Sequence, residues 1–458
     1  MTLRRMTVFG AVAAMILALG AAFTACESDS GGDRLVILSP HWEGIQTEFE
    51  RGFSEHWQEK TGNDVKFVWL DQGGTSQIMR YIRSEFSNTP DGIGADLLFG
   101  GGLDPFLRLT EAGLIDPYML PDEILDRIPE TFAGIPLYDP AGHWYGAAMS
   151  GFGIIYNGAV ARMQNAEPPQ TWEDMAKPEF NGWISAGDPR TSGSIHMAYE
   201  IMLQAYGWQH GWEIITAMSA NSRAFARSAG DIPLSVSRGD AVAGMAIDFY
   251  AWSEIHKAEG QDLGFVYPVD RTVINPDAIA ILKGAPNREI AEEFLAYVVG
   301  EPGQRIWAFK LGAPGGPAKT QLTRFTVMPD LYETNSDNIA VDINPFEWNV
   351  TFLYNDQVGS ARYDLINDMI GSMIIDSHRE LAPAWAALRE RGVPEQGLFT
   401  LAYPPISEEQ AEQLAPRWRD QGLRNQMISE WTQFARRRYE AAKSGNYGPV
   451  ERPPVPGE

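Results

Sequence analysis

The chain contains very little cysteine and little positive charge. Cys26 is the single cysteine among 458 residues, so no disulfide can form within the chain and its stability must come from a packed core. Lysine and arginine number 36 against 60 aspartates and glutamates, which gives a formal net charge of −24. Such a surface disfavours nucleic acid and anionic lipid as partners. Any site for an anion must therefore be built locally.

Signatures of enzymes and of resident metals or cofactors are also missing. Met149-Ser150-Gly151 lacks the first glycine of a nucleophile elbow, and Ala318 stands where a phosphate-binding loop would need glycine. The seven histidines show no metal-ligand spacing. We therefore predict no catalysis, no cofactor and no metal site. The many carboxylates leave a secreted hydrolase open as the least favoured alternative.

The N-terminus reads as an export signal. Arg4 and Arg5 precede an uncharged apolar run over residues 8–23, which is too short for a spanning helix of about 20 residues. The segment Phe23-Thr24-Ala25-Cys26 resembles a bacterial lipobox, with Phe23 in the place of the usual leucine. The resemblance implies that residues 1–26 form a lipoprotein signal, that Cys26 is acylated (for example with palmitate), and that residues 27–33 are a flexible spacer. The alternatives are a plain secreted protein or a retained anchor helix.

Strands that end in small-residue turns dominate the first part of the chain. Apolar strand runs at 34–38, 65–70 and 96–99 are each followed by a turn and a helix-period pattern. This alternation predicts a parallel α/β sheet, in which ligands bind beyond the carboxyl ends of the strands. Six turn residues should therefore line one crevice: Ser39, His41, Gly74, Thr75, Ser76 and Gly101.

Two long extended runs, 145–157 and 272–282, fit segments that cross between two lobes. We predict a first lobe from residues 34–143 and 275–320 and a second lobe from residues 153–270. Residues 321–445 are predicted to be mostly helical. The tail 446–458, rich in proline and glycine, is predicted to be disordered.

A second group of small polar residues opens a predicted helix in the second lobe. The guanidinium of Arg190 is a planar cation with several hydrogen-bond donors. The free N–H groups and the dipole at the N-terminus of the helix also favour binding of an anion. The same sequence is also typical of an ordinary helix cap, so both interpretations stand. Further candidates follow strands near the crossings. The ligand-site candidates of this second group are Ser150, Arg190, Thr191, Ser192, Gly193, Ser194, Asp248 and Tyr250.

Four segments in this order are similar to those of extracellular solute-binding protein family 1, the group of ferric-iron, phosphonate and sugar-phosphate binders. Residues 188–194 resemble its Pro-Arg-x-Ser-Gly segment, and they are followed by Gly-Trp-Glu at 211–213, Arg-Ser at 227–228 and Arg-Gly-Asp at 238–240. The resemblance covers roughly residues 34–320. It implies a class II periplasmic-binding-protein fold: two α/β lobes joined by crossing hinge strands, here with a helical C-terminal extension.

The resemblance also implies a function. The chain would be the substrate-binding lipoprotein of an ABC importer, a monomer tethered by lipid at the cell envelope and facing the periplasm or the exterior. It would close around a small anionic solute, bearing a phosphoryl or phosphonate group, and deliver it to the inner-membrane permease. The alternatives are a ferric-iron binder, a neutral-sugar binder, and a ligand-sensing lipoprotein that feeds a membrane receptor. Ferric iron is disfavoured because ferric-binding relatives use adjacent tyrosines as metal ligands, and no two tyrosines are adjacent in this chain.

Overall fold

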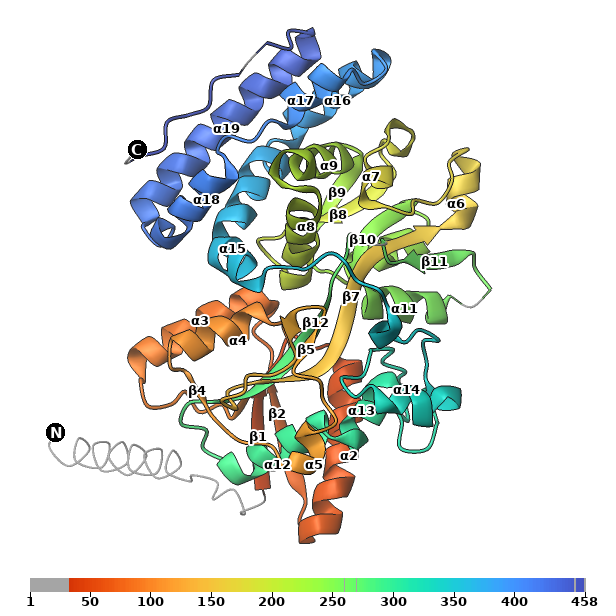
Figure 1. The fold of residues 1–458 in the computed structure, drawn as a ribbon, viewed down its shortest axis with the longest axis vertical. Coiled ribbons are helices and arrows are strands. Elements are labelled where there is room, and N and C mark those ends of the chain that lie inside the picture. Colours follow the sequence, from red (N-terminus) through yellow and green to blue (C-terminus); the bar gives the residue numbers. More distant parts are fainter. Residues whose placement is uncertain (1–32, 259, 269, 449, 457–458) are drawn as a thin grey trace, which may run out of the picture.

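The computed structural model describes residues 33–258, 260–268, 270–448 and 450–456. The predicted export signal, the lipobox and Cys26 lie outside the described residues. The chain builds two α/β lobes with a bundle of helices on one side of the second lobe (Figure 1).

Lobe one has a short mixed sheet covered by helices on both faces; its first three strands are parallel to one another, and the remaining pairings are antiparallel. Its strands fold because runs such as Leu35–Leu38 are apolar on both sides, as a sheet between two helix layers requires. On α2, Phe49 and Phe53 lie four residues apart and face the same core. The elements are β1 (Asp33–Leu38), β2 (Val65–Leu70), β3 (Leu97–Phe99), β4 (Ile115–Asp116), α2 (Glu43–Thr61), α3 (Thr75–Asn88), α4 (Asp104–Glu111), α12 (Arg288–Val299) and α13 (Glu301–Ala308).

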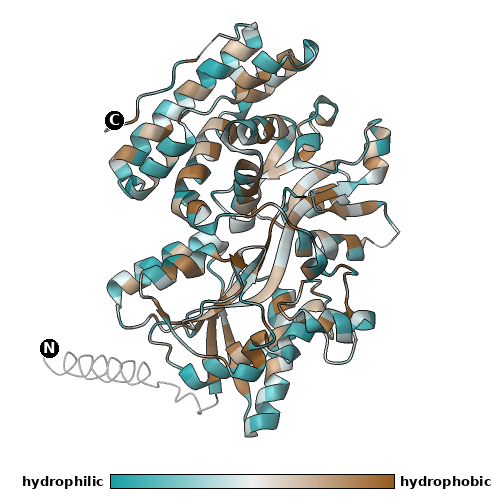
Figure 2. Cartoon of the chain, viewed as in Figure 1, coloured by the Kyte–Doolittle hydropathy of each residue, from teal (hydrophilic) through white to brown (hydrophobic). Residues whose placement is uncertain are grey.

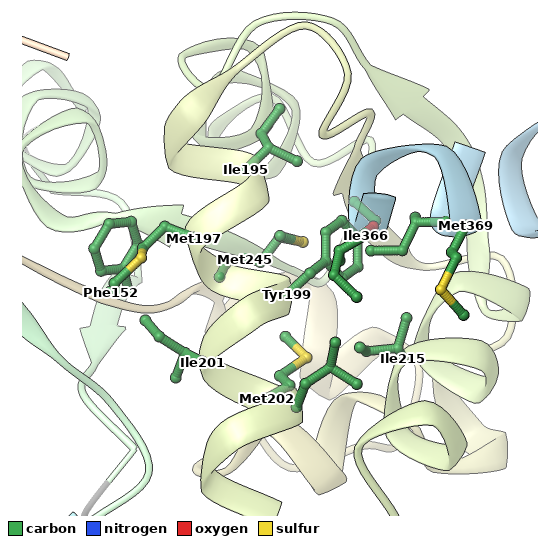
Figure 3. Packing of buried hydrophobic residues seen from close by; sticks show 14 of the residues in the cluster. Phe152, Ile195, Met197, Tyr199, Ile201, Met202, Ile215, Met245, Ile366 and Met369 are labelled. Carbon is green, nitrogen blue, oxygen red and sulfur yellow. The ribbon is translucent and has the colours of Figure 1, made fainter. Parts of the chain in front are cut away.

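Lobe two repeats this arrangement. Its core gathers around α8, where Ile195, Tyr199 and Met202 pack against neighbouring elements (Figure 3). Apolar residues concentrate on the strands and on the inward faces of the helices, and polar residues on the outer faces (Figure 2). The elements are β8 (Ile184–Gly187), β9 (Ser222–Ala226), β10 (Ala243–Ile247), β11 (Leu263–Val266), α6 (Gly158–Met163), α7 (Trp172–Met175), α8 (Gly193–Tyr206), α9 (Trp208–Ala220), α10 (Asp231–Ser237) and α11 (Asp248–Lys257).

Two long strands connect the lobes: β7 (Tyr145–Asn157) and β12 (Ile274–Leu282). The first half of β7 pairs with β12, and its second half pairs with β10 and β11. Strand pairing is therefore continuous in the order β2-β1-β3-β12-β7-β10-β8-β9. The lobes do not carry separate sheets, so any change in their relative orientation must twist β7 and β12. A register shift between Asp277 and Ala278 marks one irregular point on this connection.

The C-terminal region differs from the prediction in two ways. Its long helices begin only at Asp356: residues 321–355 form short helical turns and loops, and Phe325, Val327 and Leu331 pack in the core of lobe one. The described part of the tail, residues 450–456, packs against the protein: Val455 is buried and the Arg452 Nε donates to the Pro404 carbonyl oxygen at 3.2 Å. The helices are α14 (Asp330–Thr334), α15 (Asp356–Ile370), α16 (His378–Glu390), α17 (Glu395–Ala402), α18 (Glu408–Leu414) and α19 (Gln421–Ser444).

Candidate ligand-binding site between the lobes

The N-termini of α3 and α8, which come from different lobes, face each other. A Cβ atom added to Gly74 would lie 2.7 Å from the carbonyl oxygen of Thr191, and one added to Gly193 would lie 3.4 Å from the Thr75 Oγ1. Thus two segments that the sequence places more than a hundred residues apart meet across the cleft. Small residues allow this approach, because any larger side chain at Gly74 would collide with the opposing backbone.

This junction is rich in hydrogen-bond donors without protein acceptors. The backbone N–H groups of Gly193 and Ser194, in the first turn of α8, donate to no described residue. The hydroxyls of Thr75, Ser192 and Ser194 also have no hydrogen-bond partner in the described part of the chain. The partial positive charge of both helix N-termini adds to these donors. Together they form a local anion-binding arrangement within a strongly acidic protein.

The remaining strand-end candidates lie beside this junction in a buried polar cluster. The Ser39 Oγ accepts from the His41 N–H at 3.1 Å, and the His41 Nε2 lies 2.9 Å from the Asp277 Oδ2. Gly101 joins the cluster to α3, since an added Cβ there would lie 3.1 Å from the Thr75 Oγ1. The turns after β1 and β3 and the start of α3 therefore converge, as the sequence predicts.

Arg324 is the residue of this cluster that sequence reasoning missed. Its Nη1 donates to the Asp277 Oδ2 at 2.5 Å and to the Ser150 Oγ at 3.3 Å, and its guanidinium lies 3.7 Å from the Phe249 ring centroid. Burial opposes the charge on Asp277, but Arg324 and the His41 hydrogen bond outweigh it and hold the pKa of Asp277 well below its usual range. Burial lowers the pKa of His41, which is therefore neutral near pH 7. No local pattern identifies Arg324, because its partners lie 47 and 174 residues away.

The Asp248 carboxylate is hydrogen-bonded to other protein groups rather than directed at the cleft. Its carboxylate accepts hydrogen bonds from the Gly151 N–H at 2.6 Å, the Phe249 N–H at 2.7 Å and the Tyr267 hydroxyl at 3.1 Å. It thereby ties the middle of β7 to α11. Tyr250, two residues on, is half-buried, and its hydroxyl has no hydrogen-bond partner among the described residues. Tyr250 remains a ligand candidate, whereas Asp248 holds the crossing strand.

Asp248 should make the stability of the folded protein depend on pH. Burial raises the pKa of its carboxyl from 3.8 to about 7, against the hydrogen bond from Gly151 and the charge of Arg324. Between these values the folded protein keeps a proton that the unfolded chain releases, so stability falls as the pH rises from about 4 to about 7. We expect Asp248→Asn to remove this decline. Chemical denaturation of both proteins at pH 4.5, 6 and 8 gives the free energy of unfolding at each pH. If this free energy changed with pH in the same way in both proteins, Asp248 would not be the cause of the decline.

Arg190 is not a free cationic fork in this structure. Its Nε and Nη2 donate to Asp188 at 2.9 and 2.8 Å, and its Nη1 donates to Asp376, after α15, at 2.8 Å. Burial opposes its charge, but the two carboxylates outweigh it and raise the pKa of Arg190. Thr191 is similarly engaged, since its hydroxyl contacts the carbonyl oxygens of Asp188 and Arg227. Arg190 and Thr191 therefore shape the loop that presents Ser192, Gly193 and Ser194.

Two further properties of the described residues bear on function. No group of three or more His, Cys, Asp or Glu side chains is arranged to hold a metal ion in the described part of the chain. None of the helices in the described ranges combines the length and the apolar character that crossing a membrane requires.

Residues 94–330, more than half of the chain, match the family model of bacterial extracellular solute-binding proteins. The chain therefore belongs to this family. It is a non-enzymatic solute-binding protein of the ABC-transporter type, which acts outside the cytoplasm, and proteins of this family deliver small solutes to ABC permeases.

Individual relatives cover different shares of the chain. The phosphoglycerate transport regulatory protein PgtC of Salmonella typhimurium is 30% identical over 161 residues, 35% of this chain and 40% of that protein. The Fe(3+)-binding periplasmic protein of Serratia marcescens is 24% identical over 319 residues, 66% of this chain and 85% of that protein. The structure of the periplasmic binding protein AfuA from Actinobacillus pleuropneumoniae, with fructose-6-phosphate bound, superposes with a TM-score of 0.55 at 20% identity. It covers 80% of this chain and all of its own, and supports the two-lobe fold.

Proposed function

We propose that the protein captures a small solute with a phosphoryl or phosphonate group beside the junction where the N-termini of α3 and α8 meet, and delivers it to an ABC permease. The observation that carries the proposal is the meeting of Gly74–Thr75 with Thr191–Gly193 across the two lobes. Unpartnered N–H and hydroxyl donors lie on both sides of this junction. The relative PgtC is named for phosphoglycerate transport, which supports the same ligand class.

Affinity would come from local donors rather than from overall charge. Each hydrogen bond to a charged group contributes roughly 1.5–3 kcal/mol, and the formal net charge of −24 offers no general attraction for an anion. Closing the lobes removes water from this junction and strengthens each of these bonds. Because β7 and β12 are shared by both lobes, closure would be a twist of these two strands.

Native mass spectrometry of the purified protein tests the ligand class without a prior choice of ligand. The expected result is a co-purified small molecule that carries phosphorus, released when the protein is denatured. A ferric ion or an unphosphorylated sugar at stoichiometric level would overturn the phosphoryl proposal.

Ferric iron is the second candidate ligand, because the Serratia marcescens relative that covers two thirds of this chain is named for Fe(3+) binding. In this chain the Tyr363 hydroxyl lies at the junction, 3.6 Å from a Cβ added to Gly193, whereas the Tyr267 hydroxyl already donates to Asp248 at 3.1 Å. Titration with ferric citrate, followed by the visible absorption of tyrosinate–iron bonds, separates the two candidates. A band at stoichiometric iron would favour the second.

We also propose that the protein is a lipoprotein anchored through Cys26. The proposal rests on the apolar run over residues 8–23, the small residues before Cys26 and the uniqueness of this thiol. Cys26→Ser should abolish incorporation of labelled palmitate and release the protein from the membrane fraction into the soluble fraction. If the substituted protein stayed in the membrane fraction to the same extent, the N-terminal apolar segment itself would have to be the anchor.

A further inference from the structure

The helix α15 lies across the edge of the cleft and touches both lobes. Figure 1 shows it beside α8 and above α3 and α4. It lies beyond residue 330, where the match to the family model of solute-binding proteins ends. Its contacts with the two lobes differ in kind.

Buried contacts attach α15 to lobe two. The Arg362 guanidinium donates to the Glu200 carboxylate of α8 at 2.7 Å, and both side chains are almost completely buried. Asn367 accepts from the His196 ring at 2.7 Å; burial lowers the pKa of His196 to about 3, so the ring is neutral. Ile366 and Met369 join the apolar core around α8 (Figure 3). Breaking this attachment would expose a core, so α15 must move with lobe two.

The contacts of α15 with lobe one are polar and partly exposed. The Arg108 Nη2 of α4 donates to the Ser360 carbonyl oxygen at 2.5 Å, and its Nη1 lies 3.6 Å from the Asp364 Oδ2. The Tyr363 hydroxyl lies 3.3 Å from the Ser76 Oγ in the first turn of α3. The side chain of Asp364 is 54% exposed, and that of Arg108 is 19% exposed. Contacts of this kind can break and form without unfolding either lobe.

Tyr363 joins the two sets of contacts. Its ring lies 3.8 Å from the His196 ring on one side and 4.8 Å from the Arg108 guanidinium. A Cβ added to Gly193 would lie 3.6 Å from its hydroxyl, which places that hydroxyl at the junction of the two helix N-termini. Burial raises the pKa of Tyr363 to about 12, so the hydroxyl keeps its proton near pH 7.

We propose that α15 is an interlobe clasp: it is fixed to lobe two and engages lobe one through Arg108 and Ser76 when the lobes close. The clasp stabilises the closed form and slows the release of the ligand. In this way the C-terminal region takes part in binding, with the Tyr363 hydroxyl at the ligand junction. The effect on release rests on the proposed function, whereas the effect on lobe closure does not.

The distance between the lobes in the ligand-free protein tests the clasp. Cys26→Ser leaves the chain without cysteine, so spin labels can be placed at Ser84→Cys on α3 and Ser429→Cys on α19, both exposed. Asp364→Arg replaces the carboxylate that faces Arg108 by a second positive charge, so the two side chains repel each other. We expect it to move the distance distribution toward longer values, and Arg108→Glu in the same chain to restore part of the short-distance population. Tyr363→Phe should produce a smaller shift in the same direction.

Two controls separate an opened clasp from a general effect. Arg80→Ala removes a positive charge from an exposed side chain of α3 that has no ion pair among the described residues, and should leave the distances unchanged. Labels at Ser84→Cys and Glu59→Cys, both in lobe one, should report no change in any variant. Identical interlobe distances in the parent chain and in Asp364→Arg would overturn the clasp.

Release of a phosphorylated probe adds an independent readout. With fructose 6-phosphate, Asp364→Arg should raise the dissociation rate by about tenfold and change the association rate little. If fructose 6-phosphate does not bind the unsubstituted protein, the proposed function fails for this probe. The distance measurement still decides the clasp. An unchanged dissociation rate together with lengthened distances would show that closure does not limit release, which contradicts the role given to the clasp in binding.

Discussion

Replacing Gly74 by valine is expected to weaken ligand binding by at least about 100-fold, or roughly 2.7 kcal/mol, while leaving both lobes folded. A Cβ at this position would lie 2.7 Å from the carbonyl oxygen of Thr191, which belongs to the opposite lobe. The collision is with backbone and cannot be relieved by a rotamer change. It exists only when the lobes are closed, so the open form should tolerate the substitution.

Calorimetry with fructose 6-phosphate measures the affinity, and thermal unfolding of the ligand-free variant measures its stability. Gly448→Val is the matched control, since an added Cβ there would meet nothing nearer than 3.6 Å and it lies in the C-terminal tail. Unchanged affinity in Gly74→Val would mean that the ligand is bound without the approach of the two helix N-termini, and the proposed site would be wrong.

Arg362→Met should lower the free energy of unfolding by about 3–5 kcal/mol, the largest loss of stability that we predict. The substitution leaves the buried carboxylate of Glu200 without its cationic partner. Glu200 is completely buried on α8, and Arg362 is the only cation within salt-bridge distance of it among the described residues. Arg362 also bonds the more exposed Glu408 at 2.9 Å, so the substitution loosens α18 as well. Chemical denaturation followed by tryptophan fluorescence gives the free energy of unfolding.

An exposed ion pair of the same chemistry is the control for this substitution. Arg436→Met breaks the contact of Arg436 with Glu380 at 3.6 Å, in which both side chains are at least 40% exposed. Exposed pairs contribute about 0–1 kcal/mol, so this variant should resemble the parent. If Arg362→Met lost no more stability than Arg436→Met, Glu200 would not depend on Arg362, and the rigid attachment of α15 to lobe two would lose its main support.

Local patterns in the sequence were enough to predict the crossing strands and the convergence of the turns. The extended run at 145–157 is β7 residue for residue, because a strand buried on both faces is apolar throughout. The turns after β1, β2 and β3 meet because the carboxyl ends of parallel strands share one edge. Both inferences depend only on the order of local elements along the chain.

The contributions of the C-terminal region could not be predicted in this way. Arg324 and Tyr363 reach the cleft through contacts with residues far away in sequence, and neither lies in a pattern that differs from its surroundings. Arg190 was expected to bind the ligand, but it pairs with Asp188 and Asp376, the second of which follows 186 residues later. The sequence predicts a mostly helical region over 321–445, but residues 321–355 form short helical turns and loops whose apolar residues fill the core of lobe one.

The central claim is that hydroxyl and amide donors at the junction of α3 and α8 bind a phosphoryl group. The most direct measurement is calorimetric titration of the parent protein and of Ser192→Ala with fructose 6-phosphate and with fructose. The account predicts binding of the phosphorylated sugar alone, weakened on the order of tenfold to a hundredfold in Ser192→Ala by the loss of one hydrogen bond to a charged group. Equal affinity for fructose, unaffected by Ser192→Ala, would contradict it.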